Sequence, residues 1–230
     1  MKSNKIKRVL VVAAHPDDEI LGCGGTVARL VKEGCHVCTL ILGEGVTSRD
    51  AKRDRAKRGK EIETLKKQAR EANKRLGVRN VVLGDLPDNR FDTVPMLDII
   101  KTVEGVKKEF RPDVVYTHFW GDLNIDHRIT YNAVLTACRP VKGETVKEIY
   151  SFEAPSSTEW NHPDEFQPDT FVDITGTLDV KIKALKCYGT ELRDFPHPRS
   201  EEALRSAAKK RGSSAGITSA EAFKAVRVVR

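Results

Sequence analysis

Residues 11 to 25 read VVAAHPDDEILGCGG, in which an apolar run gives way at once to a histidine, a proline and three carboxylates. The apolar run, Val9 to Ala14, is short and rich in Val, which is typical of a buried strand. Pro16 has no N–H and fixes its own φ, so the strand ends there and the chain turns. Because open α/β sheets bind ligands at the carboxyl ends of their strands, this turn is a candidate site.

The three acidic residues of the turn are Asp17, Asp18 and Glu19. Adjacent carboxylates repel one another, so holding them together requires a compensating cation or full solvation. The alternative is a solvated turn in which Asp17 or Asp18 caps the next helix. A cap has no need of His15 at the end of the strand, and this favours a site.

The glycines that follow, Gly22-Cys23-Gly24-Gly25, have the composition of a dinucleotide-binding turn. In such a turn the glycines follow the strand directly. Here the residues from His15 to Leu21 intervene, and their carboxylates would repel a pyrophosphate. We therefore expect the glycines to let the following helix, Thr26 to Glu33, pack close to the site.

The composition fits a soluble globular chain with a substantial core. Of its 230 residues 39% are hydrophobic and 32% are charged, and the longest apolar run is far shorter than a membrane span. Met1 to Arg8 is basic, but no long apolar segment follows, so we expect no secretory signal. Five cysteines are an odd number for a disulfide scaffold and favour a reducing cytoplasm. Cys35 and Cys38 are three apart on an expected strand, so they face opposite sides and do not share a metal.

Strands and helices alternate along the rest of the chain. Further strands are predicted at Cys35–Leu42, Val81–Leu83, Val114–Thr117, Glu148–Phe152 and Phe171–Ile174, with a possible return at Phe223–Val229. Helices are predicted within Arg49–Arg75, at Met96–Phe110, from His127 to about Arg139, at Thr177–Tyr188 and at Ser200–Lys210, with Arg211–Ser214 as a turn or mobile loop. This order predicts an α/β fold with a doubly wound, mostly parallel sheet and helices on both faces. We expect one domain over residues 1–230, with the sheet core and the site in 1–150 and pocket elements in 151–230.

A second strand also ends in polar residues, the segment from His118 to His127. Together His15, Asp18 and His127 would provide two imidazoles and one carboxylate, a set that suits a catalytic Zn²⁺ with one position open for water. Asp17 would then be free to act as the general base on that water.

Asp126 is the expected partner of a metal-bound imidazole. A single histidine at the start of a helix is usually surface, but two strand ends that carry both acids and histidines are uncommon by chance.

These motifs resemble the PIG-L/LmbE-like N-deacetylases, zinc enzymes that act on N-acetylglucosamine conjugates. The similarity rests on the segment Ala14 to Glu19 and on Asp126-His127-Arg128, and it extends through Leu76-Gly77-Val78, Leu86-Pro87-Asp88 and Ala220-Glu221-Ala222-Phe223. It implies a Rossmann-like fold, the metal ligands His15, Asp18 and His127, and Asp17 as the base that drives metal-assisted release of acetate.

Asn124 departs from the family pattern, because many members carry a histidine three residues before the last metal ligand. An Asn side chain can donate a hydrogen bond to an oxyanion, but it cannot donate a proton at neutral pH. Either Asp17 returns its proton to the amine, or another histidine does so. The candidates are His118, His162 and His197, and His118 and His197 are also predicted to contact the substrate.

Positive charge is concentrated between Arg49 and Arg75, which holds 12 Lys/Arg against 5 Asp/Glu. The segment has no aromatic residue to stack on a base, so we expect no nucleic-acid partner. Its mixed charges fit a solvated helix, yet its start could bind an anionic arm of a small-molecule amino-sugar conjugate. The residues proposed for that contact are Arg49, Arg53, Arg55 and Arg58.

Two further functions stay open on the sequence alone. One is a thiol-sugar conjugate amidase with the same metal site, and the other is a basic nucleic-acid binder in which the acidic loops are structural. The sequence leaves both a monomer and a homo-oligomer open.

Overall fold

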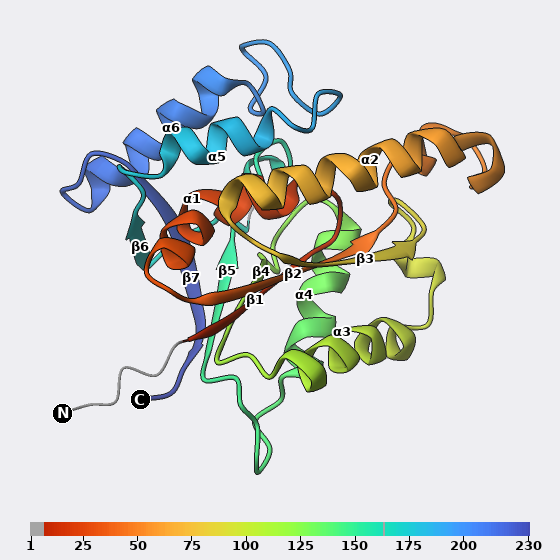
Figure 1. Ribbon diagram of the computed structural model, residues 1–230, viewed down its shortest axis with the longest axis horizontal. Helices are drawn as coiled ribbons and strands as arrows, with labels where there is room; N and C mark the ends of the chain where they lie inside the picture. Colours follow the sequence, from red (N-terminus) through yellow and green to blue (C-terminus); the bar gives the residue numbers. More distant parts are fainter. Residues whose placement is uncertain (1–6, 163) are drawn as a thin grey trace.

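The computed structural model describes residues 7–162 and 164–230, and its centre is a seven-stranded sheet (Figure 1). The strand order is β3-β2-β1-β4-β5-β7-β6, and β7 runs in the opposite direction to the other described strands. The strands are β1 (Arg8–Ala13), β2 (His36–Gly43), β3 (Asn80–Leu86), β4 (Val114–His118), β5 (Glu148–Phe152), β6 (Thr170–Asp173) and β7 (Ala220–Val228). This confirms the predicted α/β fold with a mostly parallel sheet.

Helices cover both faces of the sheet, as predicted (Figure 1). On one face lie α1 (Asp18–Lys32), α2 (Arg55–Leu76), α5 (Leu178–Leu185) and α6 (Glu201–Ser214), and on the other lie α3 (Met96–Phe110) and α4 (Ile125–Ala137). Alternate residues of β1 enter the two apolar clusters, with Val9 and Val11 in one and Leu10 and Val12 in the other. A strand buried on both faces reads as a continuous apolar run, which is why β1 was visible in the sequence.

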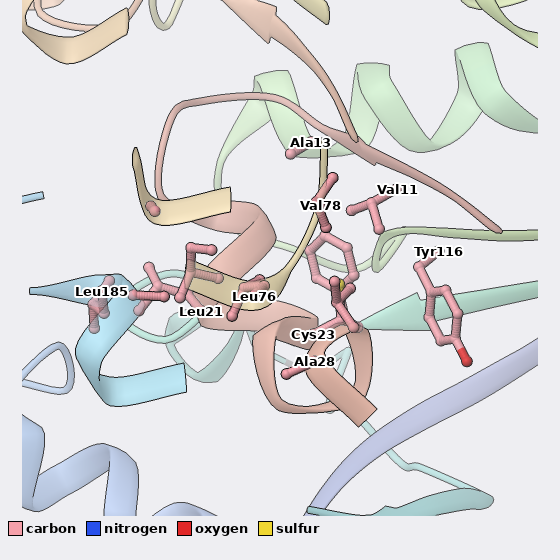
Figure 2. Packing of buried hydrophobic residues seen from close by; sticks show 14 of the residues in the cluster. Val11, Ala13, Leu21, Cys23, Ala28, Leu76, Val78, Tyr116 and Leu185 are labelled. Carbon is pink, nitrogen blue, oxygen red and sulfur yellow. The ribbon is translucent and has the colours of Figure 1, made fainter. Parts of the chain in front are cut away.

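The first helix begins at Asp18, not at Thr26, because the glycine run lies inside α1 instead of ahead of it. The helix is kinked at Cys23, where φ is −144°. A Cβ on Gly22 would lie 2.2 Å from the ring of Phe152, and one on Gly25 would lie 2.9 Å from Ile174. The glycines therefore let α1 pack close to Phe152 and Ile174, and Figure 2 shows Leu21, Cys23 and Ala28 of this helix within the buried cluster.

Residues 211–214 were predicted as a turn or mobile loop, but they form the last turn of α6. Gly212 lets the chain after the helix fold back closely against this last turn. A Cβ at this position would lie 2.6 Å from the carbonyl oxygen of Ile217, where the chain turns back toward β7. The missing side chain permits this close approach.

The cysteines behave as packing residues. Cys38 lies in one apolar cluster and Cys35 packs against the other, so the two thiols face opposite sides of the sheet, and all five cysteines are free. In the described part of the chain, none of the helices combines the length and the apolar character that crossing a membrane would require.

Candidate functional site

The polar residues after β1 and β4 meet because these two strands are neighbours in the sheet. The chain winds outward from β1 to β3 and then returns to β4 on the other side of β1. Their carboxyl ends thus form the switch point of the topology, where open α/β sheets bind ligands. The N–H of Ala14 donates to Nε2 of His118 over 2.9 Å, and this bond joins the two strand ends.

Three ligand atoms converge in this crevice: Nδ1 of His15, Oδ2 of Asp18 and Nε2 of His127. Asp18 Oδ2 lies 3.3 Å from His15 Nδ1 and 3.2 Å from His127 Nε2, and the two nitrogens are 3.3 Å apart. A tetrahedral metal with bonds of about 2.0–2.1 Å has ligand atoms about 3.3 Å from one another, so the three atoms form one face of such a tetrahedron. Oδ1 of Asp18 is buried and has no hydrogen-bond partner among the described residues. The donor set fits a metal ion with one position left open.

A carboxylate lies behind each imidazole of this set. Nε2 of His15 is 3.0 Å from Oδ2 of Asp126, whose Oδ1 accepts the N–H of Phe91 over 2.9 Å. Nδ1 of His127 is 3.1 Å from Oδ1 of Asp122. Such partners fix the orientation and tautomer of a ligating histidine. The prediction for Asp126 named no particular imidazole, and in the structure Asp126 contacts that of His15.

The charges within the cluster are strongly coupled. Burial alone would lower the pKa of His127, but Asp18 and Asp122 outweigh it and raise the pKa to about 9. Burial would raise the pKa of Asp18, but the charge of His127 and the hydrogen bonds from His127 and His15 hold it well below its usual range. Burial and His127 lower the pKa of His118 to about 3, so this imidazole is neutral.

The three consecutive carboxylates diverge to three different partners. Asp17 adopts a left-handed backbone with φ of 109°, and its Oδ2 accepts Nη1 of Arg199 over 2.8 Å. Asp18 turns toward the imidazoles, whereas Glu19 accepts the hydroxyl of Tyr188 over 2.6 Å. Asp17 occupies the N-cap position of α1, but its side chain makes no capping hydrogen bond. The capping alternative therefore does not account for these acids.

Asp17 and Asn124 line a cavity of about 150 Å³ beside His15. Burial raises the pKa of Asp17 well above its usual value, and Arg199 opposes that rise. The Oδ1 of Asn124 accepts the N–H of Asp126 over 2.8 Å, and its Nδ2 donates to Asn89 over 2.8 Å. One N–H of the Asn124 amide is still available to a ligand in the cavity.

The predicted substrate arginines separate in the structure. Arg49 lines the cavity, and its Nη2 is 3.1 Å from Oε1 of Glu191. Arg53 instead binds Glu44 at 2.8 and 2.9 Å, outside the cavity. The other two predicted arginines also lie outside the cavity and have protein partners: Arg55 pairs with Glu44 and Asp85, and Arg58 with Asp50 and Glu61.

The remaining histidines do not line the cavity either. His118 is fully buried, so it offers no surface to a substrate. Nδ1 of His197 accepts the N–H of Arg199 over 3.1 Å, which gives this ring a role within its own loop. His162 is exposed.

Sequence reasoning missed Asp122, Glu191 and Arg199. Asp122 lies in the polar segment after β4 that the sequence had singled out. Its place on a loop, four residues before Asp126, does not indicate that it contacts His127. Arg199 meets Asp17 across 182 residues, and no spacing in the sequence links the two. The one local signal for Arg199 is the pair of prolines just before it, in Pro196-His197-Pro198-Arg199. Prolines restrict the backbone, so this segment indicates a rigid loop.

Residues 10–138 match the family model described as PIG-L, GlcNAc-PI de-N-acetylase. The chain belongs to this family. The match covers more than half of the chain and contains both strand ends of the candidate metal site, which confirms the resemblance seen in the sequence.

Relatives of known name span most of the chain. An uncharacterized deacetylase, YaiS of Escherichia coli K12, is 31% identical over 190 residues, which cover 80% of this chain and 91% of the relative. A 4-oxalmesaconate hydratase of Pseudomonas putida is 29% identical over 198 residues, with 79% and 72% covered. A diacetylchitobiose deacetylase of Thermococcus kodakarensis is 26% identical over 239 residues, with 97% and 84% covered.

Solved structures share the fold. The N,N'-diacetylchitobiose deacetylase of Pyrococcus horikoshii superimposes with a TM-score of 0.76 at 21% identity, covering 97% of this chain and 85% of that chain. A 4-carboxy-2-hydroxymuconate hydratase of Pseudomonas putida KT2440 gives 0.77 at 24% identity, with 98% and 99% covered. A zinc-inhibited form of teicoplanin deacetylase Orf2 gives 0.74 at 16% identity, with 96% and 98% covered.

Proposed function

We propose that this protein is a zinc-dependent hydrolase that removes the N-acetyl group from an N-acetylglucosamine-type conjugate. The observation that carries the proposal is the convergence of His15, Asp18 and His127 at tetrahedral spacing, with a separate carboxylate, Asp17, beside them. A de-N-acetylase family and relatives named as deacetylases of acetylated sugars support it.

Each residue of the candidate site has a separate role in this proposed reaction. His15, Asp18 and His127 hold the ion, which when bound supplies a Lewis acid that polarises the amide and lowers the pKa of a water molecule. Asp17 accepts the proton of that water as the general base. Asn124 donates an amide N–H to the oxyanion that develops on the acetyl carbonyl. Since Asn124 has no proton to give, Asp17 returns its proton to the departing amine.

The substrate is a small amino-sugar conjugate that enters the cavity beside His15. Of the arginines predicted to bind the substrate, Arg49 lines this cavity. We therefore keep Arg49 as the proposed contact for an anionic arm of the substrate. We no longer propose Arg53, Arg55 and Arg58 as substrate contacts, because their side chains form ion pairs with Glu44 or Asp50.

A second candidate reaction is hydration of an unsaturated acid. A relative at 29% identity is named a hydratase, and two arginines, Arg49 and Arg199, lie at the cavity. The same donor set and base would serve, because both reactions add water to a polarised carbon. Three carboxylates, Asp17, Asp88 and Glu191, line the same cavity and disfavour an anionic substrate at its centre, so deacetylation remains the first choice.

The test is a panel assay on the zinc-loaded protein. We expect release of acetate and a free amine from at least one N-acetylglucosamine conjugate, including thiol-linked sugars and diacetylchitobiose. Unsaturated dicarboxylates form the second arm, read by loss of their ultraviolet absorbance. Hydration without any acetate release would replace the proposal with its alternative, and a panel inert in both arms would reject both.

A further inference from the structure

Arg199 reaches the candidate site from a loop between α5 and α6 that no sequence motif connects with it. Its Nη1 is 2.8 Å from Oδ2 of Asp17, and its Nε donates to the hydroxyl of Ser156 over 2.7 Å. Asp17 follows β1 and Ser156 follows β5, so the guanidinium joins two segments that are distant in the sequence. Only 23% of the Arg199 side chain is exposed.

The other contacts of Arg199 hold it in place. Its backbone N–H donates to Nδ1 of His197 over 3.1 Å, and the next residue, Ser200, caps α6. Nη1 also lies 3.7 Å from Glu191, whose other oxygen is 3.1 Å from Nη2 of Arg49. The result is a line of alternating charges, Asp17–Arg199–Glu191–Arg49, along one wall of the cavity.

The Asp17 carboxylate needs such a contact. The residue has a left-handed backbone that non-glycine residues rarely adopt, and its side chain makes no helix cap. Within residues 7–162 and 164–230, no side chain other than Arg199 donates a hydrogen bond to this carboxylate. A guanidinium that binds Oδ2 fixes the rotation of the group and leaves Oδ1 as the oxygen that can accept a proton.

We propose that Arg199 is a positioning residue that orients Asp17 for proton transfer, an inference that rests on the proposed function. Arg199 acts through Asp17, not on the substrate. Its loss should therefore lower kcat and leave KM and zinc content nearly unchanged. A guanidinium that bound the substrate would instead affect mainly KM.

The first experiment compares Arg199→Ala and Arg199→Lys with a matched control. Arg205 is also a semi-buried arginine between two carboxylates, Asp179 and Glu201, but it lies outside the cavity. We expect Arg199→Ala to lower kcat by roughly 30- to 100-fold, as for a misplaced group, with KM within about twofold. Arg199→Lys should recover part of the rate. Arg205→Ala should keep the wild-type kcat, and millimolar guanidinium chloride should raise the kcat of Arg199→Ala without changing that of Arg205→Ala. An unchanged kcat, or a loss confined to KM, would overturn the inference.

The second experiment does not depend on turnover. Urea unfolding of Asp17→Asn, Arg199→Gln and the double variant measures whether the two side chains interact. Each single change leaves a buried charge without its partner, so the double variant should lose less stability than the two single losses added together.

Additive losses would overturn the inference whatever the activity. An inactive wild-type protein would instead overturn the proposed function. An active wild type whose Arg199→Ala variant keeps its kcat would overturn this inference alone.

Discussion

At the scale of single residues, three neighbouring carboxylates acquire three different tasks because the backbone turns at Asp17. The left-handed conformation of Asp17 sends its side chain to Arg199, while Asp18 faces the imidazoles. Burial raises the pKa of Glu19 to about 7 despite the hydrogen bond from Tyr188. Repulsion among adjacent acids is thus relieved by separate partners and, in our proposal, by one bound cation.

Metal binding and base catalysis should separate in variants of the two aspartates. Asp17→Asn keeps the size of the side chain but removes the proposed base, so zinc should stay while turnover drops by roughly 10² to 10⁴-fold. Asp18→Ala removes a proposed ligand and should lose both zinc and activity. Elemental analysis measures the zinc content of both variants, and acetate release measures their turnover. Loss of zinc from Asp17→Asn would mean that the two roles are exchanged.

Zinc binding should release protons near neutral pH. The pKa of His127 is raised to about 9, so without metal this ring is largely protonated at pH 7.5, and the pKa of His15 is also raised above its usual value. Zinc binds only neutral imidazole, so we expect release of about one to two protons per ion. Affinity should therefore weaken as pH falls below the raised pKa values. Calorimetry in two buffers of different ionisation enthalpy counts the protons, and no buffer dependence would argue against these ligands.

At the scale of elements, the strands and the histidine-acid turns could be predicted because their causes are local. A doubly buried strand reads as an apolar run, and Pro16 marks its end. The placement of the glycines inside α1 could not be predicted, because what they pack against, Phe152 and Ile174, lies more than a hundred residues away. The contact of Arg199 with Asp17 could not be predicted either, because the two residues are 182 positions apart in the sequence.

A pair of glycine variants tests the close approach of α1. A Cβ on Gly22 would lie 2.2 Å from the buried ring of Phe152, which also contacts His118. Gly22→Ala should therefore lower the free energy of unfolding by roughly 1–3 kcal/mol. Gly59 in α2 has open space around its Cβ position, so Gly59→Ala should stabilise by roughly 0.5–1 kcal/mol. Urea unfolding measures both, and a Gly22→Ala protein as stable as Gly59→Ala would contradict the packing described.

At the scale of the whole molecule, the sheet order sets the position of the site, and the basic segment contributes little to it. The carboxyl ends of β1 and β4 meet at the switch point, which follows from the strand order and needed no knowledge of side chains. The basic stretch after β2 was expected to supply several substrate contacts. Most of its leading arginines instead bind acids of the same region, so only Arg49 reaches the cavity.

The rate at which each cysteine reacts with an alkylating reagent should distinguish the buried thiols from the partly exposed ones. Burial raises the pKa of Cys38 to about 11 and that of Cys138 to about 12, and Cys23 is fully buried. Cys35 and Cys187 are only partly buried. At pH 8 iodoacetamide should modify Cys35 and Cys187 first, and the other three only after unfolding. Peptide mapping by mass spectrometry identifies the order, and early labelling of Cys38 would contradict the packing of β2.

The central claim is that one metal ion, held by His15, Asp18 and His127, is required for N-deacetylation by this protein. The most direct measurement is acetate release from an N-acetylglucosamine conjugate while zinc is titrated into chelator-treated protein. We predict no release without metal, a linear rise that ends at one zinc per chain, and an equal yield of free amine. The same titration of Asp18→Ala should stay flat. Full activity in the chelated protein, or in Asp18→Ala, would contradict the account.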